Sequence, residues 1–229
     1  MVVGGLQKTS LIDYPGKISC VLFISGCNFH CPYCHNPQLV NGNVEGIEEA
    51  DVLSYLKKRK DLLDGVVVSG GEPTLHEDLP VLLDQIKLLG YPVKLDTNGT
   101  RPGMIRRLIE NGLVDYMAMD IKSDPLNYPA CITTDHDPEA VLSSIDVIKK
   151  SGLVYEFRTT CVKPIVRPND LQAITNVIAG AMLYLLQPFR DTRVLNPKYL
   201  EANGVVYSKE ELLHLKSVIE HRVRKCIVR

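Results

Sequence analysis

Three cysteines in the run GCNFHCPYC could bind a metal ion or a metal cluster. Cys27, Cys31 and Cys34 follow the spacing C-x3-C-x2-C, which places three thiols within eight residues. A structural zinc site or an electron-transfer cluster is usually closed by a fourth protein ligand. Three thiolates on one short loop suit a cubane iron–sulfur cluster with one iron left open. An open iron can bind a substrate or a cofactor, so the spacing predicts a cluster that takes part in chemistry.

Other uses of these cysteines need to be compared with this prediction. A structural zinc loop is one alternative, with His30 or His35 as the fourth ligand. A disulfide framework is disfavoured, because seven cysteines in 229 residues is a sparse and odd number. The remaining four cysteines are isolated along the chain and are expected to be ordinary thiols: Cys20, Cys131, Cys161 and Cys226.

The cysteine spacing, with Tyr33 before the last cysteine, resembles the signature of the radical S-adenosylmethionine (SAM) superfamily. The longer stretch KTSLIDYPGKISCVLFISGCNFHCPYCHNP resembles the glycyl-radical-enzyme activases. Among these it is most similar to anaerobic ribonucleoside-triphosphate reductase activating proteins, and also to pyruvate formate-lyase activating enzymes. The resemblance extends from about Gly5 to Arg190. It implies that the three cysteines hold a [4Fe–4S] cluster and that SAM binds the open iron.

The composition is that of a globular enzyme, with 45% hydrophobic and 23% charged residues. The 229 residues fit a single radical SAM domain, with a motif-bearing core at about 18–190 and a C-terminal extension of one helix at 191–229. A net charge of −1 gives no electrostatic reason to expect nucleic acid binding. The apolar runs are shorter than the ~18 residues of a membrane span. No signal peptide opens the sequence, so we expect a cytoplasmic protein.

Apolar runs typical of strands alternate with helical patterns along the chain. The predicted strands are Ile18–Ser25, Gly65–Ser69, Pro92–Asp96, Asp115–Asp120, Tyr155–Cys161 and Met182–Gln187. The predicted helices are Ile47–Arg59, Leu79–Leu89, Pro102–Asn111, Pro138–Ser151 and Asn169–Gly180. This alternation predicts an α/β fold with a parallel sheet. Six such units are too few for a closed eight-stranded barrel, and the resemblance implies a partial, TIM-like (β/α)6 barrel.

Polar or glycine-rich motifs follow the predicted strands. The cysteine loop follows the first strand, and the later motifs are SGGEP at 69–73, DTNG at 96–99, DIK at 120–122, RTTCVKP at 158–164 and LQPFR at 186–190. Parallel α/β barrels assemble their active sites at the carboxyl ends of their strands. We therefore expect these motifs to converge on one face.

Several residues at these strand ends are candidates for contacts with SAM. Gly70 and Gly71 permit close approach of the backbone to a ligand, although a tight turn alone would explain them. Glu72 is expected to shape this loop. Lys122 could neutralise the SAM carboxylate or be solvated. Arg158 lies in a buried strand, where an unpaired guanidinium is costly, so its partner is either SAM or a carboxylate of the barrel.

Two aspartates end neighbouring predicted strands. Asp96 and Asp120 would repel one another unless a cation or a donor lay between them. The resemblance implies that these carboxylates, together with Thr97, hold a monovalent cation beside SAM, and that Asp120 also contacts SAM. The alternative for Asp96 is an Asx turn that begins the Asn98-Gly99 pair.

The resemblance suggests roles for four more residues. Tyr33 and His35 would pack near the cluster and SAM, and Arg190 stands where activases often carry a histidine that meets SAM. Asp13, in the run LIDYPG, is a candidate for receiving a glycine loop of the partner protein. A simple turn that caps the bottom of the barrel is the alternative for this run.

The resemblance also implies an activity. The protein would cleave SAM reductively to a 5′-deoxyadenosyl radical and generate a glycyl radical on a partner enzyme, an anaerobic ribonucleoside-triphosphate reductase. A ferredoxin- or flavodoxin-type protein would supply the electron. One alternative is a radical SAM enzyme acting on a small molecule, as 7-carboxy-7-deazaguanine synthase does. The other is a metal-binding module without catalysis, for which the strand-end motifs would be superfluous.

Overall fold

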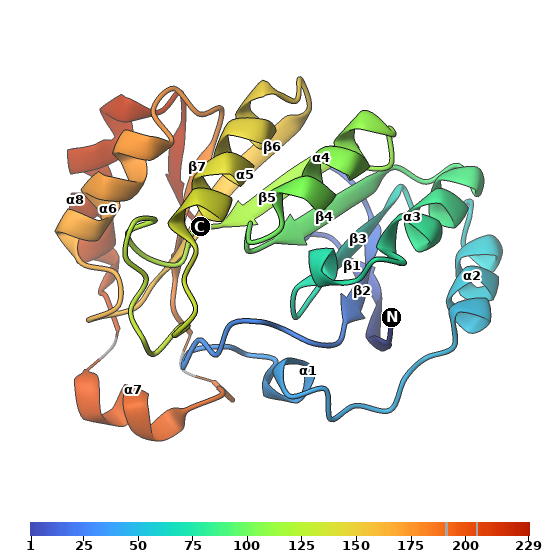
Figure 1. Cartoon of the computed structure of the whole chain (residues 1–229), viewed down its shortest axis with the longest axis horizontal. Helices are drawn as coiled ribbons and strands as arrows, with labels where there is room; N and C mark the ends of the chain where they lie inside the picture. Colours follow the sequence, from blue (N-terminus) through green and yellow to red (C-terminus); the bar gives the residue numbers. More distant parts are fainter. Residues whose placement is uncertain (191, 205) are drawn as a thin grey trace. The chain divides into compact units, whose positions relative to one another are not determined.

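A computed structural model describes residues 1–190, 192–204 and 206–229 (Figure 1). The chain divides into two compact units, each made of separate stretches. The first unit contains Met1–Asn28, Gln38–Thr97 and Gly103–Met117, and the second contains Phe29–Pro37, Asn98–Pro102 and Ala118–Arg229. Because the chain passes between the units repeatedly, no single linker separates them. The single domain expected from the sequence stays a prediction.

The first unit contains four strands in the order of the chain. They are β1 (Val3–Ser10), β2 (Ser19–Ile24), β3 (Gly65–Gly70) and β4 (Val93–Thr97). The last three pair in parallel and confirm the predicted strands to within one or two residues. The sequence did not predict β1, which pairs antiparallel with β2. Its residues VGGLQKTS include two glycines and few β-branched or aromatic side chains, so the strand signal is weak.

Helices follow these strands as the sequence predicts (Figure 1). Helices α2 (Glu49–Lys58), α3 (Leu79–Leu88) and α4 (Pro102–Glu110) confirm the predictions, whereas α1 (Pro37–Val40) and the 3-10 turn η1 (Pro73–Leu75) were not predicted. The apolar face of α3 is fully buried, and so are Val66, Val67 and Val68 of β3. Successive buried residues place apolar side chains on both faces of β3, which is typical of a parallel strand covered on two sides. Each such side chain contributes about 1.5–3 kcal/mol when fully buried.

The second unit contains the later strands. Strand β5 (Tyr116–Asp120) begins in the first unit and ends in the second. Strands β6 (Val154–Cys161), β7 (Tyr184–Pro188) and β8 (Cys226–Val228) then pair in parallel in the order of the chain. The helices are α5 (Pro138–Lys150), α6 (Pro168–Val177), α7 (Pro197–Asn203) and α8 (Lys209–Ile219), and the 3-10 turn η2 (Glu220–Arg222) follows α8. The predicted strands and helices from 115 to 180 are thereby confirmed.

The prediction of a single helix in residues 191–229 is wrong. Two helices, α7 and α8, lie there among the described residues, and β8 extends the sheet beside β7. Helix α8 packs beside α6 (Figure 1). A helix of seven residues and a strand of three are too short to produce a clear periodic pattern in the sequence. The α/β class with parallel strands is confirmed. No helix in the described part of the chain is long and apolar enough to cross a membrane.

Candidate iron–sulfur and cofactor site

The three cysteines lie in a loop that follows β2. Cys27 belongs to the first unit, and Cys31 and Cys34 belong to the second. The amide of Cys34 donates to the carbonyl oxygen of Cys31 at 2.9 Å, which closes a tight turn between these two cysteines. Cys31 is buried, whereas Cys27 and Cys34 are partly exposed, and none of the three forms a disulfide among the described residues.

No three side chains of His, Cys, Asp or Glu stand together as a metal site within the described ranges. The same finding applies to the three cysteines, so it does not separate the zinc alternative from the cluster. His35 directs Nδ1 toward Thr192 Oγ1 at 3.0 Å and the Arg193 carbonyl oxygen at 3.3 Å. The assignment of the cysteines to one cluster rests on their spacing and on the family match given below.

The surroundings of Cys31 suit a negatively charged, sulfur-ligated group. Burial raises the pKa of the Cys31 thiol to about 11, and the positive charge of Lys122 opposes this shift. The hydroxyl of Tyr33 is buried and lies beside the Cys31 thiol. Burial raises the pKa of this hydroxyl, so it stays a donor. A cation and a buried hydroxyl donor beside a thiolate suit the negative charge of a sulfur-ligated cluster.

Arg158 forms an ion pair with the barrel rather than remaining free in the buried strand. Its Nε donates to Asp120 Oδ1 at 2.7 Å, and its Nη1 lies 3.7 Å from Glu156 Oε1. Lys122 Nζ donates to the other oxygen of Asp120 at 3.0 Å. Burial alone would raise the pKa of Asp120, but Arg158 and Lys122 hold it well below its usual range. The structural ion pair, given as an alternative in the sequence analysis, is confirmed, and contacts of Arg158, Lys122 and Asp120 with SAM stay predictions.

The glycines of SGGEP bring their turn against the start of the cysteine loop. The amide of Gly71 donates to the Ile24 carbonyl oxygen and that of Glu72 to the Gly26 carbonyl oxygen, both at 2.8 Å. A Cβ atom on Gly71 would lie 2.0 Å from the Gly26 oxygen, and one on Gly70 would lie 2.3 Å from the Ile24 nitrogen. Gly70 also has a φ of +125°, which disfavours any side chain. The close approach expected toward a ligand is therefore made to the chain's own backbone, and a SAM contact stays a prediction.

Glu72 shapes this turn, as the sequence analysis expected. It is fully buried and accepts from the amide of Thr74 at 3.0 Å and from the Thr74 hydroxyl at 2.5 Å. The hydroxyl of Thr97, at the end of β4, donates to the same carboxylate oxygen at 2.8 Å. Glu72 thus ties the end of β4 to the turn after β3.

Asp96 also has a partner that sequence reasoning missed. Lys94, in the middle of β4, is only 1% exposed, and its Nζ pairs with Asp96 Oδ1. The same ammonium group lies 5.8 Å from the ring centroid of Tyr116. One signal in the sequence could have indicated this ion pair, namely a lysine inside an otherwise apolar strand that needs a charged partner when buried. The Asx turn considered for Asp96 is made by Asn98, whose side-chain oxygen accepts from the amide of Thr100 at 3.1 Å.

The two carboxylates among the three predicted cation ligands are thus each paired with a basic side chain of the same unit. Asp96 is paired with Lys94, and Asp120 with Lys122 and Arg158. The repulsion that suggested a monovalent cation is therefore relieved within the chain, and the cation stays a prediction.

The remaining candidates are His35, Arg190 and Asp13. The His35 ring stacks on Phe189 at 5.8 Å between centroids, just after β7, and Arg190 next to it is exposed. Asp13 accepts from the Ser10 hydroxyl at 2.5 Å. Ser10 pairs with Ser19 at the start of β2, whereas the cysteine loop follows the end of that strand. This position agrees with the capping turn considered above, and the contacts of Asp13 and Arg190 with partner and SAM stay predictions.

Comparison with known proteins decides the family. The Radical SAM superfamily matches residues 21–171, well over half of the chain. The chain belongs to the radical SAM superfamily. Proteins of this superfamily use a [4Fe–4S] cluster and SAM, so these are its cofactors. That Cys27, Cys31 and Cys34 hold the cluster stays a prediction.

Several relatives refine the comparison within the superfamily. A Methanocaldococcus jannaschii protein assigned to the glycyl-radical enzyme activating enzymes is 37% identical over 82% of this chain and 80% of that protein. The pyruvate formate-lyase-activating enzyme of Clostridium pasteurianum is 34% identical over 58% of each chain. The 7-carboxy-7-deazaguanine synthase of Aquifex aeolicus is 32% identical over 37% of this chain and 38% of that protein. These relatives indicate that this radical SAM protein is an enzyme.

The fold comparison agrees with the family. Streptococcus suis SuiB bound to S-adenosylmethionine superposes with a TM-score of 0.65 and 14% identity, covering 91% of this chain and 51% of that one. This radical SAM chain thus spans about half the length of SuiB. At this identity the likeness shows the fold, and it confirms the radical SAM core expected from the sequence.

Proposed function

We propose that this radical SAM enzyme is a glycyl-radical-enzyme activase. The observation that carries the proposal is the 37% identity to an activating enzyme over 82% of this chain. The shorter match to a pyruvate formate-lyase-activating enzyme supports it. The substrate would be a protein loop that presents a glycine, because only glycine has a Cα hydrogen without side-chain obstruction.

The chain's own residues would position the cofactors and balance their charge. When bound, the cluster and SAM supply a one-electron cleavage that yields methionine and a 5′-deoxyadenosyl radical, which takes one hydrogen atom from the glycine Cα. Cys27, Cys31 and Cys34 would hold the cluster by three thiolates. Lys122 would offset the negative charge near Cys31, as its opposing effect on the Cys31 pKa indicates. The buried hydroxyl of Tyr33 would donate a hydrogen bond there.

The finer parts of the proposal concern partners. We infer that the glycine-bearing partner is an anaerobic ribonucleoside-triphosphate reductase, on the resemblance of the stretch around the cysteines. A ferredoxin- or flavodoxin-type protein would supply the electron, and the cytoplasm would be the location. The second candidate function is a small-molecule reaction like that of 7-carboxy-7-deazaguanine synthase, and the 32% identity over 37% of the chain favours it.

The test uses anaerobically reconstituted protein with SAM and dithionite. Formation of 5′-deoxyadenosine, measured by chromatography, is expected for either radical SAM function, and its absence would favour a binding module. A glycyl radical signal in the electron paramagnetic resonance (EPR) spectrum of an added anaerobic reductase is expected only for an activase. A reductase whose target glycine is replaced by alanine is the control. Turnover of the deazaguanine precursor with no radical on any glycyl radical enzyme would overturn the proposal.

A further inference from the structure

We propose that Thr192–Asn196, named here the C-terminal strap, is a positioning element for the cysteine loop and its cluster. The strap lies in the C-terminal extension, for which the sequence suggested no role. The inference needs the cluster but does not depend on which substrate the enzyme uses. All contacts that support it lie within the second unit.

The strap pairs with the backbone of the cysteine loop. The amide of Leu195 donates to the Cys34 carbonyl oxygen at 2.9 Å, and the amide of Asn196 donates to the Pro32 carbonyl oxygen at 3.0 Å. The loop residues 28–36 contain no helix or strand of their own, so these carbonyl groups depend on partners from elsewhere in the chain. The strap thus supplies two hydrogen bonds that flank the last cysteine.

A side chain next to that cysteine reinforces the backbone contacts. His35 Nδ1 lies 3.0 Å from Thr192 Oγ1 and 3.3 Å from the Arg193 carbonyl oxygen. The ring also stacks on Phe189 with planes 6° apart. His35 is therefore held on one side by the strap and on the other by the residue after β7.

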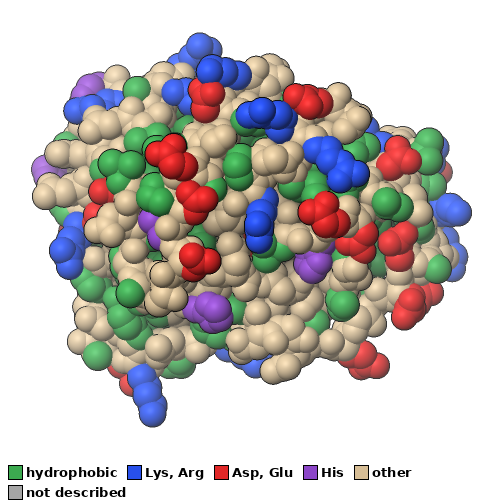
Figure 2. All heavy atoms as spheres, in the orientation of Figure 1, with side chains coloured by type: hydrophobic (Ala, Val, Ile, Leu, Met, Phe, Trp, Pro, Cys, Tyr) green, Lys and Arg blue, Asp and Glu red, His purple; other side chains and the backbone are tan. Residues whose placement is uncertain are grey.

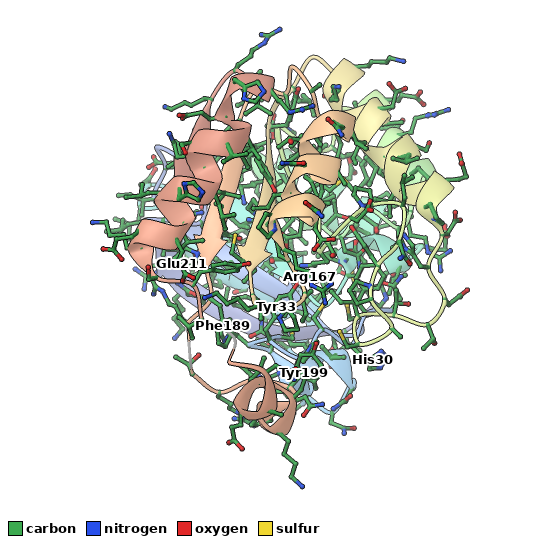
Figure 3. All side chains as sticks on the ribbon, turned by 90° about the vertical axis from the view of Figure 1, so that its left-hand side faces the viewer. His30, Tyr33, Arg167, Phe189, Tyr199 and Glu211 are labelled. Atoms are coloured by element: carbon green, nitrogen blue, oxygen red, sulfur yellow. The ribbon has the colours of Figure 1, made fainter. Side chains whose placement is uncertain are left out.

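The strap is itself anchored at its far end. The Asn196 side chain accepts from the amide of Tyr199 at 3.1 Å and caps α7. The Cys131 thiol donates to the Tyr199 hydroxyl at 3.7 Å, and the neighbouring Ile132 carbonyl oxygen accepts from the His30 amide at 2.8 Å. Figure 3 labels His30, Tyr33 and Tyr199 in this region. The cysteine loop, residues 131–132, α7 and the strap therefore form a closed ring of contacts.

This ring has a physical consequence for cluster binding. Ordering the backbone of a free loop costs conformational entropy, so a cluster that must order its own loop binds more weakly than one whose loop is already ordered. The strap contacts order the loop in advance, each hydrogen bond contributing about 1 kcal/mol. Loss of one such bond should therefore let the cluster escape about fivefold faster, since 1.4 kcal/mol corresponds to a factor of ten.

The experiment compares cluster retention in matched variants of the full chain. Leu195→Pro removes the amide that bonds Cys34, whereas Leu195→Ala removes the side chain and keeps the amide. His35→Phe keeps the ring on Phe189 and removes the contact with the strap, and Thr192→Ser is its conservative control because the hydroxyl remains. The readouts are iron release to a chelator and the EPR signal of the reduced cluster.

We expect about fivefold faster iron release and an altered EPR signal for Leu195→Pro and His35→Phe, with wild-type behaviour for both controls. Circular dichroism shows whether Leu195→Pro folds. If it does not fold, the comparison of iron release between His35→Phe and Thr192→Ser tests the proposal instead. The proposal is overturned if His35→Phe releases iron at the wild-type rate, or if Leu195→Pro and Leu195→Ala release iron at the same rate. No glycyl radical partner enters this assay, so its outcome is independent of the proposed activase function.

Discussion

At the scale of single residues, the charges near the strand ends are paired within their own unit. Lys94 is the least expected of them, because a lysine that is 1% exposed would be costly without a partner. Its ion pair with Asp96 and its position near the Tyr116 ring explain how the strand accommodates it. Breaking one half of such a pair leaves an uncompensated charge in the interior.

Replacing Lys94 by methionine tests this pairing. Met fills a similar volume but leaves the largely buried Asp96 carboxylate without its ammonium partner, so we expect a loss of about 3 kcal/mol of unfolding free energy. The double variant with Asp96→Asn should recover most of the loss, because no charge then remains unpaired. Urea unfolding of the apo-protein measures both. Equal stability of the Lys94→Met variant and the wild type would show that the ion pair contributes nothing.

At the scale of elements, the turn after β3 and the loop after β2 form one structure. Two backbone hydrogen bonds join them, and neither Gly70 nor Gly71 leaves room for a side chain. The glycines were predicted because a ligand could approach their backbone, whereas the structure shows that the loop leading to Cys27 already approaches it. The SGGEP turn therefore supports the first cysteine.

Replacing Gly71 by alanine should lower cluster content. The new Cβ would lie 2.0 Å from the Gly26 oxygen, so the backbone before Cys27 must shift. We expect a several-fold loss of bound iron and sulfide after reconstitution, measured by chemical analysis. Gly103→Ala in α4 is the matched control, because nothing lies within 4 Å of its Cβ position and alanine favours a helix. Full cluster content in the Gly71 variant would contradict this account.

At the scale of the whole molecule, surface charge and thiols are both dispersed. Figure 2 shows acidic and basic side chains interspersed on the face in view. This mixture is consistent with the net charge of −1. Outside the cysteine loop, Cys20, Cys161 and Cys226 are buried and Cys131 is partly exposed. The four thiols thus differ in environment, although the sequence alone gave no reason to distinguish them.

This difference predicts which of these four thiols react in the folded apo-protein. Burial raises the pKa of Cys20 and Cys161 to about 12 and that of Cys226 to about 11, so all three are neutral thiols at pH 8. We expect iodoacetamide to modify Cys131 well before these three, and all four to react in urea. Mass spectrometry of digested protein measures the order. Rapid labelling of Cys20 at pH 8 would mean that its strand opens readily.

The sequence alone was enough to determine the local features of this protein. The cysteine spacing indicated the cluster, and the alternation of apolar strands with helices indicated a parallel α/β fold, because both signals depend on residues close together in the chain. The bounds of β2, β3 and β6 were accordingly predicted to within two residues.

Only the tertiary structure decided which distant groups meet. Arg158 pairs with Asp120 across 38 positions, and the contact between His35 and Thr192 spans 157. Such pairings depend on which elements pack together, and no periodic pattern in the sequence encodes that choice. The short elements α7 and β8 were missed for the same reason, because their stability comes from the neighbours on which they pack rather than from their own propensity. The eight-residue strand β1 was missed because its own strand signal is weak.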